Sequence, residues 1–256
     1  MNIVVCISSV PDTTSKINFT ENNTKFDSNG IQFVINPNDE FGLTRAMMLK
    51  EANGGVVKVI TVGDNTTESV IRKALAIGAD SAIRIDKSAT DSYTTALEIS
   101  NYIKENPADL IIAGKESLDY NGGAVPAMIA EILHLPFVNA CIGLKIDNGN
   151  AKLSREIDGG KEILSAALPL VIGGQKGLVQ ESELRIPNMR GIMQARTKPL
   201  EVIEPSSTKE LTSSVSFEKP AEKESCKLVD AGNVAELVNL LHNLSLIHIS
   251  EPTRPY

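Results

Sequence analysis

Residues 153–172 read LSREIDGGKEILSAALPLVI, and this stretch predicts two strands joined by a tight turn. Two alternating runs flank Asp158-Gly159-Gly160, and glycine readily adopts the positive φ angles that such a turn requires. The second run passes through Pro169 into a continuous apolar strand that ends at Ile172. Spacing alone therefore predicts an ordinary antiparallel hairpin that leads into a buried strand of a larger sheet.

Outside this hairpin, apolar runs alternate with stretches of helical periodicity. Asn65 and Glu68 resemble a capping box at the start of one such helix, and Gly78 is placed to end it. Alternation of this kind predicts βαβ units and parallel strands. The expected strands are residues 1–8, 56–62, 82–85, 110–113 and 168–172, and the expected helices are residues 39–52, 66–77, 93–104 and 125–133. We therefore expect an α/β fold with a doubly wound, mostly parallel, Rossmann-like sheet, an appended antiparallel hairpin and an extended C-terminal arm.

The C-terminal part of the chain has a different composition. Residues 205–225 are rich in Ser, Thr, Lys, Glu and Pro, so they cannot bury a core and are expected to form a linker or an arm. Residues 233–243 predict an amphipathic helix whose apolar face contains Val234, Leu237, Leu240 and Leu241. Residues 244–256 resemble translated vector or adapter sequence. The predicted organisation is a domain over 1–200, an arm with a docking helix over 201–243, and an artefactual tail over 244–256.

Composition and charge exclude several classes of protein. The chain has 256 residues, is 42% hydrophobic and carries a formal net charge of −7, which argues against nucleic acid as a partner. Cys6, Cys141 and Cys226 are far apart, so neither a metal site nor a disulfide framework is expected. No apolar run is long enough to span a bilayer, and no signal peptide is recognisable. These observations predict a cytoplasmic protein that is not itself embedded in a membrane.

A ligand site is expected where two loops meet. In an open parallel sheet, ligands bind at the carboxyl ends of the strands where the strand order reverses. The usual order places the loop at residues 8–12 beside the glycine-rich loop at residues 114–123, which leads into the helix at 125–133. A helix amino end after small residues suits a phosphate, although an ordinary βα loop would look the same. Neither GxGxxG nor GxxxxGK[ST] is present.

Catalytic groups are harder to find than a ligand site. His134 lies at a predicted helix end, and His242 lies on the final predicted helix. No Ser-His-Asp, Cys-His or paired-carboxylate arrangement suggests itself. A nucleotide pocket without reaction chemistry favours a carrier over an enzyme.

Several segments of the chain together resemble one family. The hairpin contributes Arg155, the Asp158-Gly159-Gly160 turn, Glu162 and Pro169. The other matching segments are residues 3–13, 35–40, 61–63, 72–80, 113–119 and 186–196. In this order they resemble the electron transfer flavoprotein β subunit. The chain departs from the family pattern at Ser8, Ser9, Thr13, Asn38, Ala124 and Gly173.

The resemblance implies a heterodimer with an α subunit that holds most of the redox-active FAD. The β subunit would supply one wall of the flavin site and bind a structural AMP, or a second FAD in bifurcating members. The flavin would pass electrons from acyl-CoA dehydrogenase-type donors to a quinone oxidoreductase. The nucleotide pocket of the family maps here to Cys6, Asn36, Pro37, Asn38, Asp39, Val62, Asp119, Asn121, Gly122, Gly123, Ala124, Val125, Ala127, Met128 and Ala130. The surface that docks the dehydrogenase maps to Ile186, Pro187 and Met189.

Two other classes share the expected fold. One is a nucleotide-binding signalling or stress-type module without a redox role, and the other is an adenylate-forming type of enzyme. The hairpin and the long arm favour the carrier subunit, since a compact signalling module needs neither. The enzyme would need a phosphate-loop motif that this sequence lacks.

Overall fold

The chain folds into two compact units in the computed structural model, which describes residues 1–221 and 227–243. The first unit, Met1–Phe217, contains the sheets and helices α1 to α5. The second unit, Glu218–Tyr256, contains helix α6, Val234–Asn243, which buries none of its residues. The expected helix at 233–243 is therefore confirmed, whereas the expected artefactual tail lies outside the described residues. No helix within the described ranges is both long and apolar enough to cross a membrane.

The main sheet has nine strands in the order β11-β10-β9-β12-β8-β1-β6-β7-β13. Neighbouring strands from β9 to β13 in this order pair in parallel, and only the β9-β10 and β10-β11 pairs are antiparallel. The strands are β1 Asn2–Cys6, β6 Val56–Val62, β7 Ser81–Ile85, β8 Leu110–Gly114, β9 Phe137–Asp147, β10 Asn150–Ile157, β11 Gly160–Ala167, β12 Leu170–Gly174 and β13 Leu200–Ile203. The doubly wound, mostly parallel sheet with an antiparallel hairpin is thus confirmed.

Strand β9 belongs to both parts of the sheet. Its first residues pair in parallel with β12, for example Phe137 with Val171, and its later residues pair antiparallel with β10, for example Leu144 with Leu153. The change of partner coincides with a positive φ of 53° at Ala140.

The expected turn at Asp158-Gly159-Gly160 is present, and a second tight turn joins β9 to β10. Asn148 and Gly149 have φ angles of 48° and 79°, and Gly159 has a φ angle of 82°. Arg155 and Glu162 are cross-strand partners, and Arg155 Nε donates to Glu162 Oε2 at 2.6 Å. The residues that carry the family resemblance in this hairpin therefore form a structural cross-strand pair.

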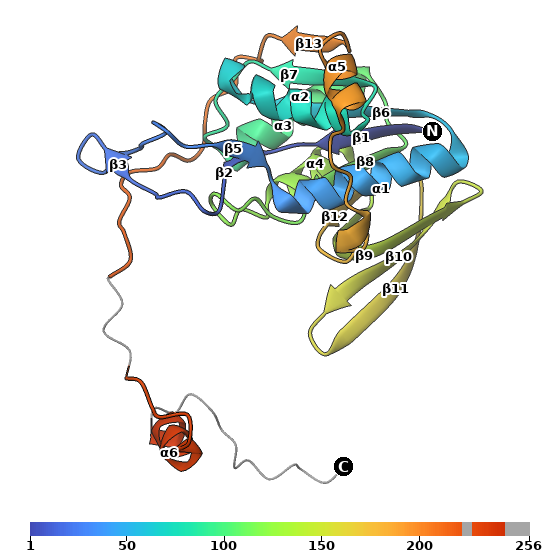
Figure 1. Ribbon diagram of the computed structural model, residues 1–256. Helices are drawn as coiled ribbons and strands as arrows, with labels where there is room; N and C mark the ends of the chain where they lie inside the picture. The colour runs from blue at the N-terminus through green and yellow to red at the C-terminus, as the bar shows by residue number, and fades with distance from the viewer. Residues whose placement is uncertain (222–226, 244–256) are drawn as a thin grey trace. The chain divides into compact units, whose positions relative to one another are not determined.

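Helices cover both faces of the sheet (Figure 1). One apolar cluster packs α1, α2 and α5 against side chains such as Ile3 and Val5, and the other packs α3 and α4 against the alternate residues Val4 and Cys6. The helices are α1 Pro37–Asn53, α2 Glu68–Ile77, α3 Ser92–Glu105, α4 Val125–Leu133 and α5 Met189–Ala195. Side chains of a strand alternate between faces, so two covered faces require apolar residues at every position of the central strands.

The start of α2 differs from the expected capping box. Asp64, rather than Asn65, accepts a hydrogen bond from Thr66 N at 2.9 Å. This contact caps a short 3₁₀ turn, η1 Asn65–Thr67, and α2 begins only at Glu68. Gly78 ends α2 as expected, with a φ angle of 147°.

Smaller elements border the carboxyl end of the main sheet. Strands β2, Ser9–Pro11, and β5, Phe33–Ile35, form an antiparallel pair. Strands β3, Phe19–Thr20, and β4, Lys25–Phe26, form a second pair. A second 3₁₀ turn, η2 Glu181–Glu183, precedes α5.

Candidate functional site

The strand order reverses at β1, which lies between β8 and β6. The loops that follow β1 and β8 therefore lie side by side, as the sequence predicts. A cavity of about 750 Å³ opens at these strand ends. Its walls include Cys6 of β1, Val62 of β6 and Ala113 of β8. A volume of this size is in the range of small-molecule and cofactor sites.

Asp39 joins the two loops. This residue, in the first turn of α1, is only 2% exposed. Its Oδ2 accepts from Ser8 N at 2.7 Å, and its Oδ1 accepts from Gly114 N at 2.8 Å. One carboxylate thus fixes the backbone after β1 relative to the backbone at the end of β8.

Gly114 allows this close approach. A Cβ atom there would lie 2.3 Å from Asp39 Oδ1 and 2.9 Å from Asn36 Nδ2. Asn36 Nδ2 and Asn38 Nδ2 both donate to Glu116 O, at 2.9 Å and 3.2 Å. The start of α1 therefore holds the β8–α4 loop through its backbone.

The surroundings of Asp39 change its acidity and that of Cys6. Burial raises the pKa of the Asp39 carboxyl to about 7, although the amide donors act in the opposite direction. Burial, together with the nearby Asp39 charge, also raises the pKa of the Cys6 thiol well above its ordinary value. Cys6 is therefore a neutral wall residue rather than a reactive thiolate.

The loop between β8 and α4 closes on itself before the helix begins. Ser117 N donates to Gly122 O at 3.0 Å, and Asn121 has a φ angle of 49°. Val125 and Pro126, the first residues of α4, line the cavity. The amino end of α4 therefore lies at the cavity, where its dipole favours an anion.

The structure brings some of the expected nucleotide residues together at this cavity and not others. Seven of them line it, namely Cys6, Asn36, Asp39, Val62, Asp119, Gly122 and Val125. Pro37, Asn38, Asn121, Gly123 and Ala124 lie in the same segments but are not part of the wall. On α4, Ala127 is exposed, whereas Met128 and Ala130 pack with the apolar cluster of α3 and α4.

Other wall residues were not expected from the sequence. Asp64 and Thr67 follow β6, the segment from Ser88 to Ser92 follows β7, and Thr95 lies on α3. The strand-end rule would have found these loops, since β6 and β7 were both expected. Thr212, Ser213 and Ser214 also line the cavity, and their polar, low-complexity surroundings gave no signal for this.

The wall contains acidic but no basic side chains. Asp39, Asp64, Asp91, Glu116 and Asp119 line the cavity, whereas none of its described lining residues is Lys, Arg or His. A bound phosphate would therefore depend on amide and hydroxyl donors. Over residues 1–221 and 227–243, no cluster of three or more His, Cys, Asp or Glu side chains is placed to hold a metal ion.

The expected partner-binding residues form a separate surface. Ile186 and Met189 are 85% and 75% exposed, and neither they nor Pro187 lines the cavity. Ile192 and Met193 of α5 are also exposed. The result is an apolar patch next to the buried anchor of α5, Ala195.

Comparison with known proteins identifies the family. A model described as the electron transfer flavoprotein domain matches residues 24–208. The electron transfer flavoprotein subunit beta of Bacillus subtilis (strain 168) is 35% identical over 80% of this chain and 79% of the relative. The chain belongs to the electron transfer flavoprotein β-subunit family.

Further relatives agree with this assignment. The electron transfer flavoprotein subunit beta of Syntrophomonas wolfei is 37% identical over 78% of each chain. The "Caffeyl-CoA reductase-Etf complex subunit CarD" of Acetobacterium woodii is 29% identical over 79% of this chain and 78% of the relative. The match to the family model covers most of the first unit. It ends at residue 208, before the cavity-lining residues Thr212 to Ser214.

Proposed function

We propose that this chain is the β subunit of a heterodimeric electron transfer flavoprotein. Its α partner would hold most of the redox FAD, which supplies the electron-carrying chemistry. The complex would accept electrons from acyl-CoA dehydrogenase-type donors and deliver them to a quinone oxidoreductase. The observation that carries the proposal is the family match together with a large strand-end cavity that has the position and size of a nucleotide pocket.

The cavity would hold AMP or, in a bifurcating complex, a second FAD. Asn36 lines the cavity, and its buried Oδ1 has no hydrogen-bond partner within the described protein, so a ligand N–H or O–H would satisfy it. The backbone after β8 and the amino end of α4 would bind the phosphate. Because the wall is acidic, a nucleotide with few negative charges suits it better than a triphosphate.

The wall of the flavin site is proposed to lie elsewhere on this chain. Thr13 lines a second cavity of about 250 Å³ between the β2-β5 pair and helices α1 and α2. Thr13 and Asn38 occupy positions that in some members of the family carry aromatic residues near the flavin ring. Residues Val10 to Thr13 would therefore orient the flavin edge while the α subunit holds the rest of the cofactor.

Two exposed apolar surfaces are proposed to bind partners. Ile186 and Met189 would anchor the electron-donating dehydrogenase. The apolar face of α6, which includes Val234 and Leu237, would clasp the α subunit. Val234 and Leu237 are 63% and 46% exposed, so each has apolar area available for burial.

Expression with and without an α subunit tests the carrier role. We expect the lone chain to be colourless and the co-purified complex to show stoichiometric flavin absorbance. Acid denaturation followed by mass spectrometry of the released ligands should yield AMP or extra FAD. A complex that contains neither nucleotide beyond the single redox FAD would contradict the proposed cavity ligand.

Gly122→Val tests the position of that ligand. A Cβ at Gly122 meets only Ser117 Oγ, at 3.7 Å, so the larger side chain should project into the cavity without straining the fold. Nucleotide occupancy should fall while the urea unfolding midpoint changes little. Gly160→Val is the matched control, because Gly160 has open space around it and lies outside the cavity.

A further inference from the structure

Residues 204–217, which we call the strap, contribute to the wall of the cavity. The strap follows β13 at the edge of the sheet and runs past α3 to the β3-β4 pair, as the orange trace in Figure 1 shows. Its residues Thr212, Ser213 and Ser214 line the cavity. The strap belongs to the first compact unit, which agrees with the expected arm rather than with the alternative of a linker.

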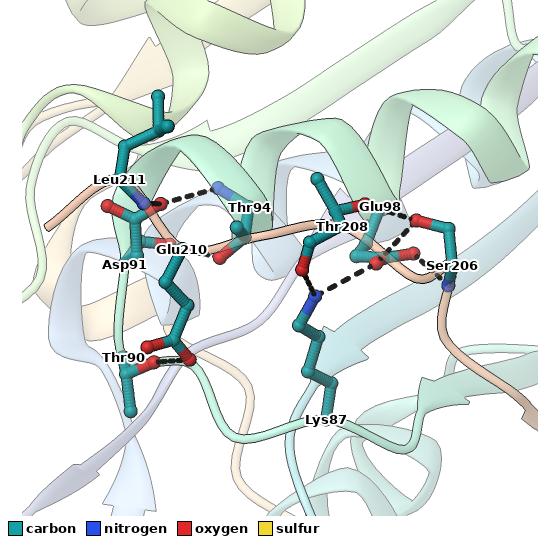
Figure 2. Close-up of polar contacts among 9 residues, drawn as sticks. All are labelled: Lys87, Thr90, Asp91, Thr94, Glu98, Ser206, Thr208, Glu210 and Leu211. Carbon is teal, nitrogen blue, oxygen red and sulfur yellow. Dashed lines mark hydrogen bonds and ion pairs between the residues drawn. The ribbon is translucent and has the colours of Figure 1, made fainter.

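Glu98 of α3 provides the first attachment of the strap. It is 4% exposed and accepts from Ser206 N at 3.0 Å and from Ser206 Oγ at 2.7 Å. Lys87 pairs with Glu98 at 3.3 Å and donates to Thr208 O at 3.2 Å (Figure 2). The strap thus adds hydrogen bonds to a largely buried ion pair between Lys87, just after β7, and Glu98 of α3.

Asp91 provides the second attachment. It accepts from Leu211 N at 3.5 Å and from the Thr212 hydroxyl, while its other role is to cap α3 through Thr94 N at 3.0 Å. The neighbouring Thr90 hydroxyl donates to Glu210. Figure 2 shows the contacts of Asp91 with Leu211 and Thr94 and the contact between Thr90 and Glu210. Asp91 and Thr90 also line the cavity, so this attachment lies at its edge.

The far end of the strap is attached to the β3-β4 pair. The ring of Phe217 stacks on that of Phe19 with a centroid separation of 5.0 Å and an interplanar angle of 8°. Phe217 N donates to Asn23 O at 2.7 Å. Phe26, which pairs with Phe19, lines the cavity. The strap is therefore attached at both of its ends, and its hydroxyl-bearing middle forms part of the cavity wall.

Polar contacts, rather than apolar burial, hold the middle of the strap. Leu211 and Val215 are 66% and 80% exposed. The hydrogen bonds from Ser206 and Thr212 go to the carboxylates of Glu98 and Asp91, and their net free energy is still limited because water replaces a lost partner. Such a segment can detach locally while the sheet stays folded.

We propose that the strap is a latch on the nucleotide cavity, and that a bound nucleotide leaves only after the strap detaches from Asp91 and Glu98. This inference rests on the proposed nucleotide site. The coupling is reciprocal, so a nucleotide that contacts Thr212 to Ser214 also holds the strap in place. Nucleotide occupancy therefore controls whether the beginning of the C-terminal arm is anchored.

Ser206→Ala, Thr212→Val and the double variant test the latch. Each change removes a strap hydroxyl and leaves Asp91, the cap of α3, intact. Thr197→Val is the matched control, because Thr197 is exposed, its hydroxyl donates only to Gln194 O at 3.1 Å, and it lies outside the cavity wall. Radiolabelled AMP is loaded on the full-length protein and chased with excess unlabelled AMP. The double variant should release AMP roughly ten- to a hundredfold faster than the wild type and the control.

Trypsin cleavage after Lys209 reports the strap directly, since Lys209 lies within it. AMP should slow this cleavage in the wild type, and the double variant should be cleaved faster than the control. Equal AMP release rates in the wild type and every variant, or cleavage that AMP does not change, would overturn the latch. A wild-type protein that retains neither AMP nor FAD would instead overturn the nucleotide site itself, and the latch with it.

Discussion

Asp39 and Asp91 both line one cavity and use the same chemistry to different effect. Each carboxylate accepts hydrogen bonds from chain segments far away in the sequence. Asp39 binds backbone amides at the ends of two central strands, so its partners cannot move without the sheet. Asp91 binds a threonine hydroxyl and an amide on a polar strap. The comparison teaches that the partners, rather than the carboxylate, decide whether such a junction is permanent or reversible.

Gly114→Ala should have the largest effect, because it disrupts the permanent junction that Asp39 makes between the ends of two central strands. The new Cβ would lie 2.3 Å from Asp39 Oδ1, which must then break its bond to the Gly114 amide. We expect a loss of about 3 kcal/mol or more in the free energy of unfolding, measured with urea. Gly160→Ala, with open space around its Cβ, should change this value by less than about 1 kcal/mol. A Gly114→Ala protein of wild-type stability would show that the Asp39 junction is not rigid.

Asp39→Asn should change the pH dependence of stability. Burial raises the folded-state pKa of Asp39 to about 7, above its ordinary value of 3.8, so the folded state binds the proton more tightly. The stabilisation that this group provides is complete below its unfolded pKa and is lost as the pH rises through its folded pKa. The stability advantage of the wild type over Asp39→Asn should therefore shrink by about 1–3 kcal/mol between pH 5 and pH 8. Parallel curves of urea stability against pH for the two proteins would contradict the raised pKa.

Glu98→Gln should have a moderate effect on stability and on the attachment of the strap. The amide still accepts from Ser206, but Lys87, which is 15% exposed, loses its counter-charge. We expect a loss of about 1–3 kcal/mol and faster trypsin cleavage after Lys209. Glu162→Gln breaks the exposed Arg155 pair, whose side chains are 39% and 41% exposed, and should cost less than about 1 kcal/mol. Equal losses in the two variants would mean that the strap adds nothing to the Glu98 pair.

Thr212→Val should have the smallest effect on stability and a clear effect on Asp91. The Thr212 hydroxyl is the largest cause of the lowered pKa of the Asp91 carboxyl. Its removal should raise that pKa towards the ordinary value and change the free energy of unfolding by about 1 kcal/mol or less. Carboxyl chemical shifts followed through an NMR titration measure the pKa, with Thr197→Val as the control. An unchanged Asp91 pKa would show that Thr212 does not contact it in solution.

Local sequence patterns predicted the sheet around the Asp39 junction well. Alternating strand and helix periodicity predicted the strands around the switch point, and the Asp158-Gly159 turn predicted the hairpin. The sequence also placed Asn36 and Asp39 at the pocket through the family resemblance, although nothing local showed that Asp39 would be buried beneath two backbone amides. A carboxylate in a first helical turn is equally well explained by the helix dipole.

The contacts of the strap with Asp91 and Glu98 could not be predicted from the sequence, for a physical reason. Ser206 and Glu98 are 108 positions apart, and Thr212 and Asp91 are 121 apart, so no local period connects them. Glu98 on a helix resembles a solvated surface residue until the strap covers it. Strand β13, with four residues at the sheet edge, also carries too short a pattern to be recognised.

Strand β11 has a consequence for handling the protein. It is the last strand of the described sheet at that side, so one row of its backbone N–H and C=O groups has no neighbouring strand there. Lys161 and Glu162 place charge near the turn, but the remaining residues, Ile163 to Ala167, are uncharged, and Ile163 is 58% exposed. Open edges of this kind add strands from other chains and seed aggregation. Production of the lone chain therefore calls for low concentration or a charged substitution at Ile163, whereas the sheet interior needs no such protection.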